Sequence, residues 1–259
     1  MVRREKTNYT IQSVSHALDV LEQLGRRGDE IGVTELSKRL KLHKNNVFRL
    51  LATLEARSYV EQNRATENYR LGLKCLQLGE AYVQQIGFLH QAQATLHKLA
   101  EQSKESSFVS MRKGMTILPL DFVESKNTVR VASFLGGTLP LHCTAPGKVH
   151  LAFDSEEELR AGLPEKLTRY TEQTIIDRPI LLKEVDHISG EGYAIEDGEF
   201  IEDLKCVAVP VRDHTRSLVG CISVAGPAHR LTLQRIRQDI VPLIVQEGRA
   251  LSVRLGFHD

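Results

Sequence analysis

The sequence predicts an α+β protein with an N-terminal winged helix-turn-helix, a linker helix and a C-terminal domain that mixes strands with helices. Three observations support this fold class. Helical apolar periodicity dominates the first part of the chain, a hairpin pattern follows it, and short β-rich runs interleave with helical segments from about residue 108 onward. The 259 residues suffice for two domains. We place them at residues 1–72 and 89–259, with the linker helix over residues 73–88.

Three helices are predicted before the hairpin. Apolar residues spaced i, i+3, i+4, i+7 and i+10 mark the first helix, and Gly25 and Gly28 end it. VTELSKRL (Val33–Leu40) predicts a short second helix with Thr34 as its N-cap. A third helix follows after a three-residue break, which completes a helix-turn-helix behind a supporting helix. The apolar positions are Val14, Ala17, Leu18, Leu21 and Leu24 in the first helix and Val47, Leu50, Leu51 and Leu54 in the third.

The hairpin and the linker helix follow directly. Residues 59–72 place apolar and aromatic residues on both sides of a polar connection, which indicates a β-hairpin with Arg64 near its tip. The next segment is helical up to a break near Gly87, and a second helix follows it. The apolar residues of the linker exceed what one isolated helix could cover, so we expect some to pack against a second copy of the chain. They are Leu73, Leu76, Leu78, Tyr82 and Ile86.

The C-terminal part alternates β-rich and helical segments, as expected for an α/β or α+β sensor-like domain. The predicted strands are residues 108–112, 116–123, 128–134, 206–213 and 218–226. The predicted helices are residues 146–153, 155–162 and 180–191, with a final amphipathic helix over 232–255.

Composition and charge narrow the function. Hydrophobic residues make up 41% of the chain and charged residues 26%, as in ordinary globular proteins. No segment approaches the ~20 apolar residues that cross a bilayer, and the N-terminal MVRREKTNYT lacks the apolar core of a signal peptide. We therefore expect a cytoplasmic protein that does not contact membranes. The four cysteines lack CxxC spacing, which argues against a disulfide framework and a structural zinc site.

The net charge of +1 conceals an asymmetry. Residues 1–75 carry 14 Lys and Arg against 9 Asp and Glu, a net charge of +5. Residues 76–259 carry 20 against 24, a net charge of −4. This distribution indicates that only the N-terminal part meets a polyanion.

The third helix carries a polar face suited to DNA. At 100° per residue, Asn45, Arg49 and Ala52 lie opposite the buried stripe. Asn can bond adenine and Arg guanine in the major groove, and a small Ala allows close approach. A solvated helix surface is the alternative, but the helix-turn-helix context, the hairpin and the basic N-terminal part favour DNA. The predicted DNA-binding residues are Lys44 for phosphate, Asn45, Asn46, Arg49 and Thr53 on the helix, and Arg64 on the hairpin.

Four segments resemble the IclR family of bacterial transcription regulators, in order and with family-like spacing. The N-terminal one is VTELSKRLKLHKNNVFRLLATLEARSYVE. The C-terminal ones are GGTLPLHCTAPGKVHLA, GYAIEDGEFIEDLKCVAVPV and CISVAGP. The resemblance implies a winged helix-turn-helix, a linker helix and an effector-binding domain similar to GAF and PAS sensors. It also implies a repressor or an activator that binds palindromic double-stranded DNA operators as a homodimer or homotetramer. Of the two we expect a repressor, acting on a catabolic operon.

The resemblance further implies an effector pocket. In the family it is lined by the positions that here are Thr144 and Ala145, Glu196 and Asp197, Cys206, and Ser223. This chain has Pro146 where many members have Gly or Ala, and Ala225 where Ser often stands. To this lining we add four small or medium-sized apolar residues, Val131, Leu139, Leu204 and Ala225.

The residues of the pocket favour a small organic acid as effector: a sugar acid, an α-keto acid or an aromatic carboxylate. Exposed N–H groups at the start of the helix near Pro146 are expected to bind a carboxylate, with Lys148 adding positive charge. Glu196 and Ser223 can bond a hydroxyl or keto oxygen. Because the chain has no Trp, a deep aromatic cage is not expected.

A competing hypothesis is an enzyme that processes a small molecule and uses its N-terminal domain only to dimerise. The sequence shows no catalytic constellation to support it, since Cys206 in an apolar strand is expected to be a small hydrophobe rather than a nucleophile. His142, Cys143 and His150 lack diagnostic metal-ligand spacing. We expect no metal and no cofactor. A constitutive architectural DNA binder would leave the sensor-like domain unexplained.

Overall fold

The computed structural model describes residues 10–26, 30–85, 87–155, 157–159 and 163–258. The chain divides into two compact units, Met1–Gln85 and Ile86–Asp259. Gly28 and Ile86 lie outside the described residues, as does the side chain of Tyr82. Within the described residues, no helix has both the length and the hydrophobicity needed to cross a membrane.

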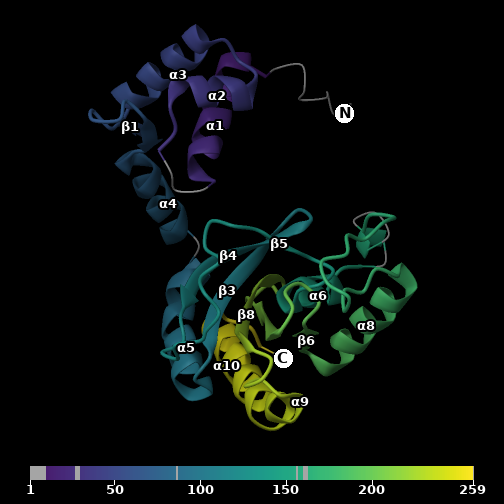
Figure 1. The fold of residues 1–259 in the computed structure, drawn as a ribbon. Helices are drawn as coiled ribbons and strands as arrows, with labels where there is room; N and C mark the ends of the chain where they lie inside the picture. Colours follow the sequence, from purple (N-terminus) through teal and green to yellow (C-terminus); the bar gives the residue numbers. More distant parts are fainter. Residues whose placement is uncertain (1–9, 27–29, 86, 156, 160–162, 259) are drawn as a thin grey trace, which may run out of the picture. The chain divides into compact units, whose positions relative to one another are not determined.

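The N-terminal unit is a winged helix-turn-helix, as predicted (Figure 1). The turn between its second and third helices is short because Lys41 adopts a left-handed conformation, with φ at 54°, that ends the second helix. The hydroxyl of Ser37 then donates to the carbonyl of Leu42 at 2.6 Å and closes the turn. The elements are α1 (Gln12–Gly25), α2 (Val33–Leu40), α3 (Lys44–Ala56), β1 (Val60–Gln62), β2 (Tyr69–Leu71) and α4 (Leu73–Gln85).

Two details of this unit differ from the sequence prediction. Val14 and Leu18 of α1 were expected in the core, but each is 53% exposed. Of the predicted set, Leu24 is buried and Ala17 and Leu21 are partly buried against this core, and Val20, which was not predicted, is buried beside them. The predicted N-cap Thr34 is also wrong: the chain enters α2 through Gly32, and no side chain caps the helix.

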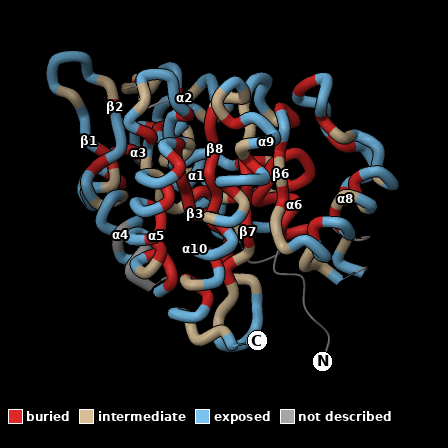
Figure 2. Tube along the Cα trace, turned by 90° about the horizontal axis from the view of Figure 1, so that it is seen from below, coloured by how far each residue is buried: buried red, intermediate tan, exposed pale blue. Residues whose placement is uncertain are grey.

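The C-terminal unit contains a six-stranded antiparallel sheet in the order β5-β4-β3-β8-β7-β6. Figure 2 shows that β3 and β8, at its centre, are largely buried. The strands are β3 (Ser106–Lys113), β4 (Thr116–Val123), β5 (Leu139–Pro140), β6 (Ala194–Asp197), β7 (Leu204–Arg212) and β8 (Leu218–Pro227).

Side chains that alternate along the strands build a separate core on each face of the sheet. On β7, Val207 and Val209 face α5 (Gly87–Ser103) and α10 (Val241–Arg254). Cys206 and Ala208 face the opposite way, toward α6 (Ala145–Ala152) and α8 (Arg178–Glu191). Figure 1 shows these two helix pairs on opposite sides of the strands. This period-2 alternation is what a sheet covered on both faces requires.

Two predictions in this unit are wrong and one lies largely outside the described residues. Residues 128–134 form no strand. The outer edge of β4 pairs with β5 only at Thr116 and Ile117, and the carbonyl of Val131 accepts a 2.8 Å bond from the Ser106 hydroxyl. The final helix is not uniformly α-helical: α9 (Leu233–Arg235) leads through a π-helical turn, η2 (Ile236–Ile240), into α10. Of the predicted helix at 155–162, only residues 155 and 157–159 are described, and 157–159 are helical.

Candidate DNA-binding surface and effector cavity

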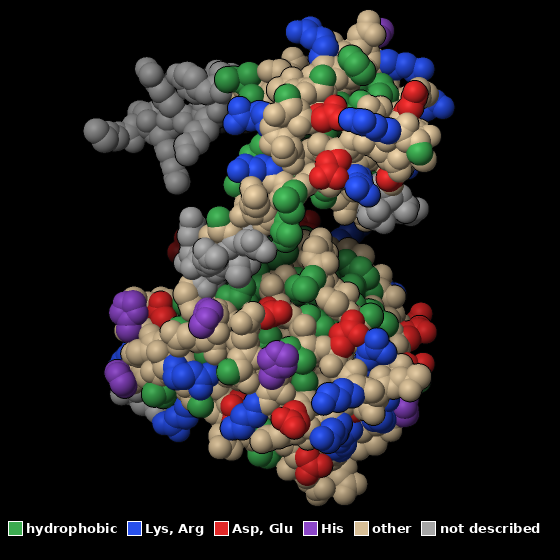
Figure 3. Space-filling view, turned by 90° about the vertical axis from the view of Figure 1, so that its left-hand side faces the viewer, with side chains coloured by type: hydrophobic (Ala, Val, Ile, Leu, Met, Phe, Trp, Pro, Cys, Tyr) green, Lys and Arg blue, Asp and Glu red, His purple; other side chains and the backbone are tan. Residues whose placement is uncertain are grey.

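The exposed side of α3 carries the polar residues predicted to bind DNA. Val47, Leu51 and Leu54 are buried and fix the orientation of the helix. The predicted contacts on its other side are all exposed, although the hydroxyl of Thr53 is used locally and donates to the carbonyl of Arg49 at 2.8 Å. Figure 3 shows Lys and Arg side chains spread over the surface of this unit. The exposed predicted residues are Lys44, Asn45, Asn46, Arg49, Thr53 and, on the hairpin, Arg64.

An aromatic residue also lies on this surface, although the sequence did not indicate it as a DNA-binding residue. Phe48 is 57% exposed on α3, although a large apolar side chain normally turns inward. The signal was present in the helical spacing, because Phe48 lies about 100° from the buried Val47 and therefore outside the apolar stripe. A phenyl ring at this place is suited to contact a thymine methyl group.

The hairpin is tied to the segment that precedes α2. The side-chain amide of Asn63 donates to both carboxylate oxygens of Glu30 at 2.9 Å, and the hydroxyl of Thr66 donates to the same carboxylate. These bonds lower the pKa of Glu30. A further bridge joins Ile31 to Tyr69, so that the base of the wing is anchored while Arg64 remains exposed at its tip.

In the C-terminal unit, strand register gathers part of the predicted effector pocket. Glu196, Cys206 and Ala225 are direct neighbours across β6, β7 and β8. They line a small cavity, called the effector cavity below, whose volume is about 20 Å³. Such a volume holds about one water molecule. The lining consists of Phe108, Phe134, Leu139, Thr144, Pro146, Glu196, Phe200, Ile201, Leu204, Cys206 and Ala225.

Four predicted pocket residues do not line this cavity. Asp197 follows Glu196 on β6 and therefore points to the opposite side, where it is exposed and pairs with Lys205 at 3.0 Å. Ala145, Val131 and Ser223 are buried in the surrounding core. Ser223 pairs with Phe108 and Ala208 in the sheet, two residues before Ala225 on β8.

The cavity is more aromatic than expected. Phe108, Phe134 and Phe200 all contribute to its wall. Phe122 stacks on Phe108 with ring centres 5.7 Å apart and meets Phe134 edge to face at 6.1 Å. The absence of Trp therefore did not predict how aromatic the cavity is, because phenylalanines that are distant in the sequence come together only in the folded structure.

The start of α6 offers fewer free N–H groups than the sequence suggested. Thr144 is the N-cap, and its hydroxyl accepts from the backbone N–H of Gly147 at 3.2 Å. Pro146 has no N–H to offer. The expected carboxylate site at this helix start is thus largely occupied by the protein's own cap.

Lys148 is also committed to internal partners. It is only 1% exposed, and its Nζ donates to Glu199 Oε1 at 2.6 Å and to the carbonyl of Ile195 at 2.7 Å. Glu184 lies 3.5 Å from the same nitrogen. The expectation of a positive charge available to a ligand is corrected accordingly, because Glu199 neutralises this ammonium group inside the core.

Glu196 is the carboxyl group that faces the cavity. It is 2% exposed and accepts a 3.2 Å hydrogen bond from the backbone N–H of Phe200. Burial raises its pKa to about 8, against the opposing effect of that hydrogen bond. At neutral pH this side chain is therefore mainly a neutral carboxylic acid, which can donate a hydrogen bond as well as accept one.

The thiols near the cavity are in their protonated form. Burial raises the pKa of Cys143 to about 12, and it raises the pKa of Cys206 well above the ordinary value. A protonated buried thiol is a poor nucleophile. Among the described residues, no three His, Cys, Asp or Glu side chains gather in a way that would hold a metal ion.

A larger groove adjoins the effector cavity. Its volume is about 580 Å³, and it shares Leu139 and Phe200 with the cavity wall. The ring of Phe200 packs edge to face on Tyr170 with centres 5.1 Å apart. Phe200 therefore lines both the effector cavity and an adjoining space large enough for a small molecule.

Comparison with known proteins identifies relatives over nearly the whole chain. Residues 80–253 match the model of the bacterial transcriptional regulator IclR C-terminal domain, and residues 13–64 match the IclR helix-turn-helix domain. The chain is 31% identical to the HTH-type transcriptional regulator KdgR of Escherichia coli, over 98% of this chain and 97% of KdgR. It is 34% identical to the HTH-type transcriptional repressor AllR of Salmonella paratyphi A, over 95% of this chain and 90% of AllR.

A solved structure shows the same fold. The IclR homologue of Microbacterium hydrocarbonoxydans, crystallised in complex with 4-hydroxybenzoate, superposes with a TM-score of 0.85 at 17% identity. The alignment covers 94% of this chain and 99% of that one.

Proposed function

The chain belongs to the IclR family of bacterial transcriptional regulators, and from this premise we propose that it is a ligand-responsive repressor that binds palindromic operators and responds to a small organic acid. It is a DNA-binding regulator and not an enzyme, which removes the competing hypothesis. The name of AllR supports repression. The single observation that carries the DNA-binding proposal is the exposed polar side of α3 in a basic winged helix-turn-helix.

Asn45, Arg49 and Phe48 supply the base contacts in this proposal. They leave the same side of α3, with Lys44 at its N-terminus, where backbone N–H groups and the ammonium group attract a phosphate. Asn46 and Thr53 flank this set, and Arg64 extends from the wing toward the minor groove or the backbone. Two copies of the unit, related by a two-fold axis, would read half-sites one or more helical turns apart.

Footprinting tests this assignment on the DNA upstream of the gene and of its divergent neighbour. Arg49→Ala is expected to cost about 1–3 kcal/mol and to relax sequence preference at one base position. Lys44→Ala is expected to weaken binding to all sequences alike and to flatten the salt dependence. Lys183→Ala, an exposed charge on α8, is the matched control. An unchanged footprint with Arg49→Ala would refute this choice of recognition surface.

The effector is proposed to bind where Glu196 faces the cavity. A neutral carboxylic acid at Glu196 can donate to a ligand carboxylate or keto oxygen, while Phe108 and Phe134 pack against the carbon skeleton. The volume of about 20 Å³ means that the cavity must open, and displacement of Phe200 would join it to the adjacent groove. The aromatic wall and the 4-hydroxybenzoate complex of the Microbacterium homologue both support an aromatic carboxylate within the proposed class.

A thermal-shift screen of metabolic carboxylates tests this proposal. A ligand present at 100 times its Kd stabilises the folded state by ~2.7 kcal/mol, which is a shift in Tm on the order of 5 °C. Cys206→Phe and Ala225→Leu fill the effector cavity and are expected to abolish the shift. Ile180→Phe, at an exposed position on α8 outside the cavity, is the matched control. A shift that persists in both filled variants would place the effector elsewhere.

A further inference from the structure

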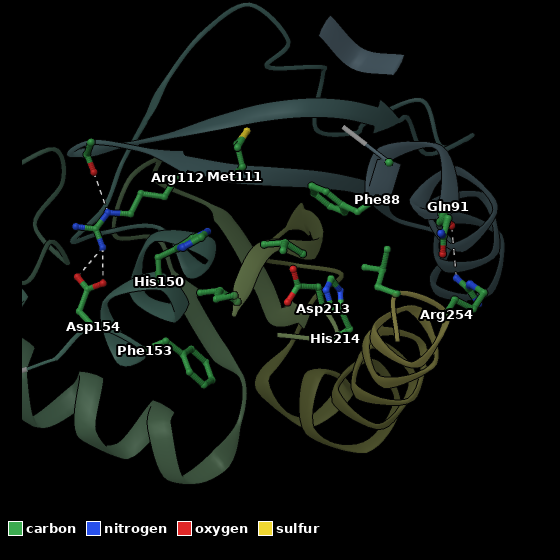
Figure 4. Close-up of a pocket in the computed structure, with 15 residues that line it drawn as sticks. Phe88, Gln91, Met111, Arg112, His150, Phe153, Asp154, Asp213, His214 and Arg254 are labelled. Carbon is green, nitrogen blue, oxygen red and sulfur yellow. Dashed lines mark hydrogen bonds and ion pairs between the residues drawn. The ribbon is translucent and has the colours of Figure 1, made fainter. Parts of the chain in front are cut away.

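A second and larger groove lies in the C-terminal unit, away from the effector cavity. It is called the His150 groove below; its volume is about 930 Å³, within the range of small-molecule sites. Among the described residues it shares no lining residue with the effector cavity. Figure 4 shows side chains from β3, the end of α6, the β7–β8 turn, α5 and α10 around this space.

His150 is the unusual member of this lining. It is 6% exposed, and its Nε2 has no hydrogen-bond partner among the described residues. Figure 4 shows the ring extending from α6 toward the space below Met111. A buried nitrogen without a partner is destabilising, so a ligand that bonds it supplies the hydrogen bond that the protein lacks. Burial, and next Arg112, lower the pKa of His150 to about 4, so the ring is neutral at physiological pH.

The charged groups of the groove balance one another. The guanidinium group of Arg112 donates to Asp154 Oδ1 at 2.6 Å and to the carbonyl of Gly114 at 2.8 Å. Asp213 accepts from the backbone N–H and the hydroxyl of Thr215. Arg254 donates to the hydroxyl of Thr95 at 2.6 Å. The lining contains two Arg and two Asp, whose formal charges cancel, so these four side chains give the groove no net charge that would attract an ion.

The remaining wall is mainly apolar and contains two aromatic rings. We propose that the His150 groove is a second ligand site, which binds an uncharged, mainly apolar molecule of the phenol or aromatic-alcohol class through a hydrogen bond to Nε2 of His150. The apolar body of the ligand packs on side chains that would otherwise contact water. The apolar lining residues are Phe88, Met111, Phe153, Leu218, Val219 and Leu255.

Ligand-observed NMR titration of the full-length protein with 4-methylphenol tests this proposal, with toluene as the probe that lacks the hydroxyl. We expect saturable binding of 4-methylphenol, weakened about fivefold by His150→Leu, which is the range for loss of one neutral hydrogen bond. His150→Gln keeps a donor and an acceptor and is expected to restore most of the affinity. Toluene is expected to bind more weakly and to be insensitive to His150→Leu.

Two variants separate this site from the effector cavity. Val219→Trp fills the His150 groove and is expected to abolish binding, which also keeps the test decisive if His150→Leu does not fold. Cys206→Phe fills the effector cavity and is expected to leave the Kd of 4-methylphenol unchanged. Loss of binding in Cys206→Phe, or equal binding in the wild type and Val219→Trp, would overturn the second site without affecting the proposed function.

Discussion

Glu196 and Lys148 are both buried ionisable residues, and their surroundings differ. The Nζ of Lys148 donates to Glu199 Oε1 at 2.6 Å. Burial instead raises the pKa of Glu196 to about 8, so that the carboxyl group keeps its proton. The sequence could indicate that one acidic residue near position 196 faces inward, since strand alternation separates Glu196 from Asp197. It could not indicate that Lys148 meets Glu199, because 51 residues separate them.

The pKa of Glu196 predicts how stability depends on pH. A carboxyl group whose pKa is about 8 when folded and near 4.5 when unfolded holds its proton more tightly in the folded state. The stability of the folded state should therefore fall by ~1.4 kcal/mol per pH unit as the pH rises between these values. In Glu196→Gln this decline should disappear. Urea unfolding of the wild type and Glu196→Gln at roughly pH 5, 6, 7 and 8 measures how the free energy of unfolding depends on pH. If that free energy changed with pH in the same way in both proteins, the assigned pKa would be contradicted.

The Lys148–Glu199 pair gives a second residue-level prediction. Lys148→Leu leaves the Glu199 carboxylate buried without its cation, and removing one partner of a buried pair costs about 3–5 kcal/mol. The double replacement Lys148→Leu with Glu199→Leu removes both charges and should recover most of that loss. Chemical denaturation of the three proteins tests this coupling. A double variant no more stable than Lys148→Leu would contradict this account, because the loss would then not come from a Glu199 carboxylate left without its cation.

At the scale of elements, the start of α6 combines a cap with a close backbone approach. The Thr144 hydroxyl caps the helix, so Thr144→Ala should cost about 0.5–2 kcal/mol. A methyl group on Gly147 would meet the carbonyl oxygen of Leu141 well inside contact distance. Gly147→Ala should therefore destabilise more than the loss of the cap does. Thermal unfolding ranks the two variants, with Gly190→Ala on α8 as a control that meets no atom.

Elements with strong local signals could be predicted from the sequence. The periodicity of VTELSKRL gave α2 its observed bounds, Val33–Leu40. Residues 128–134 look equally strand-like, but a strand also needs a pairing partner, and the sequence pattern does not show which partner the fold supplies. In the structure β5 pairs with β4, and the carbonyl of Val131 accepts from the Ser106 side chain instead. The effector cavity was partly predictable, since Cys206 and Ala225 lie in recognisable strands. Phe134 and Phe200 were missed because they come from irregular segments that only the tertiary fold brings together.

At the scale of the whole molecule, α4 carries apolar side chains that no other described part of the same chain covers. Leu73, Leu76 and Leu78 are 60%, 58% and 51% exposed. At 100° per residue, Leu78 lies about 140° from Leu73, so apolar surface occurs on two sides of one helix. Large exposed apolar surface of this kind is typical of an interface.

We therefore predict that the protein assembles through α4 as a homodimer or homotetramer. Sedimentation at micromolar concentration should give a mass at least twice that of the 29.1 kDa chain. Leu73→Glu with Leu76→Glu should shift the distribution toward the monomer and weaken operator binding. Ile180→Glu, an exposed apolar residue on α8, is the control. A wild-type protein that sediments only as a monomer would refute the assembly.

The division of the chain at residues 85 and 86 has a consequence for how such regulators diversify. The proposed operator contacts all precede that point, and both ligand sites follow it. A recombination event at this boundary would join the existing DNA-binding unit, with its α3, to the effector-binding domain of another protein. The regulated genes would stay the same, and the small molecule that controls them would change. A duplicated regulator can thus acquire a new inducer while its operator-binding residues stay unchanged.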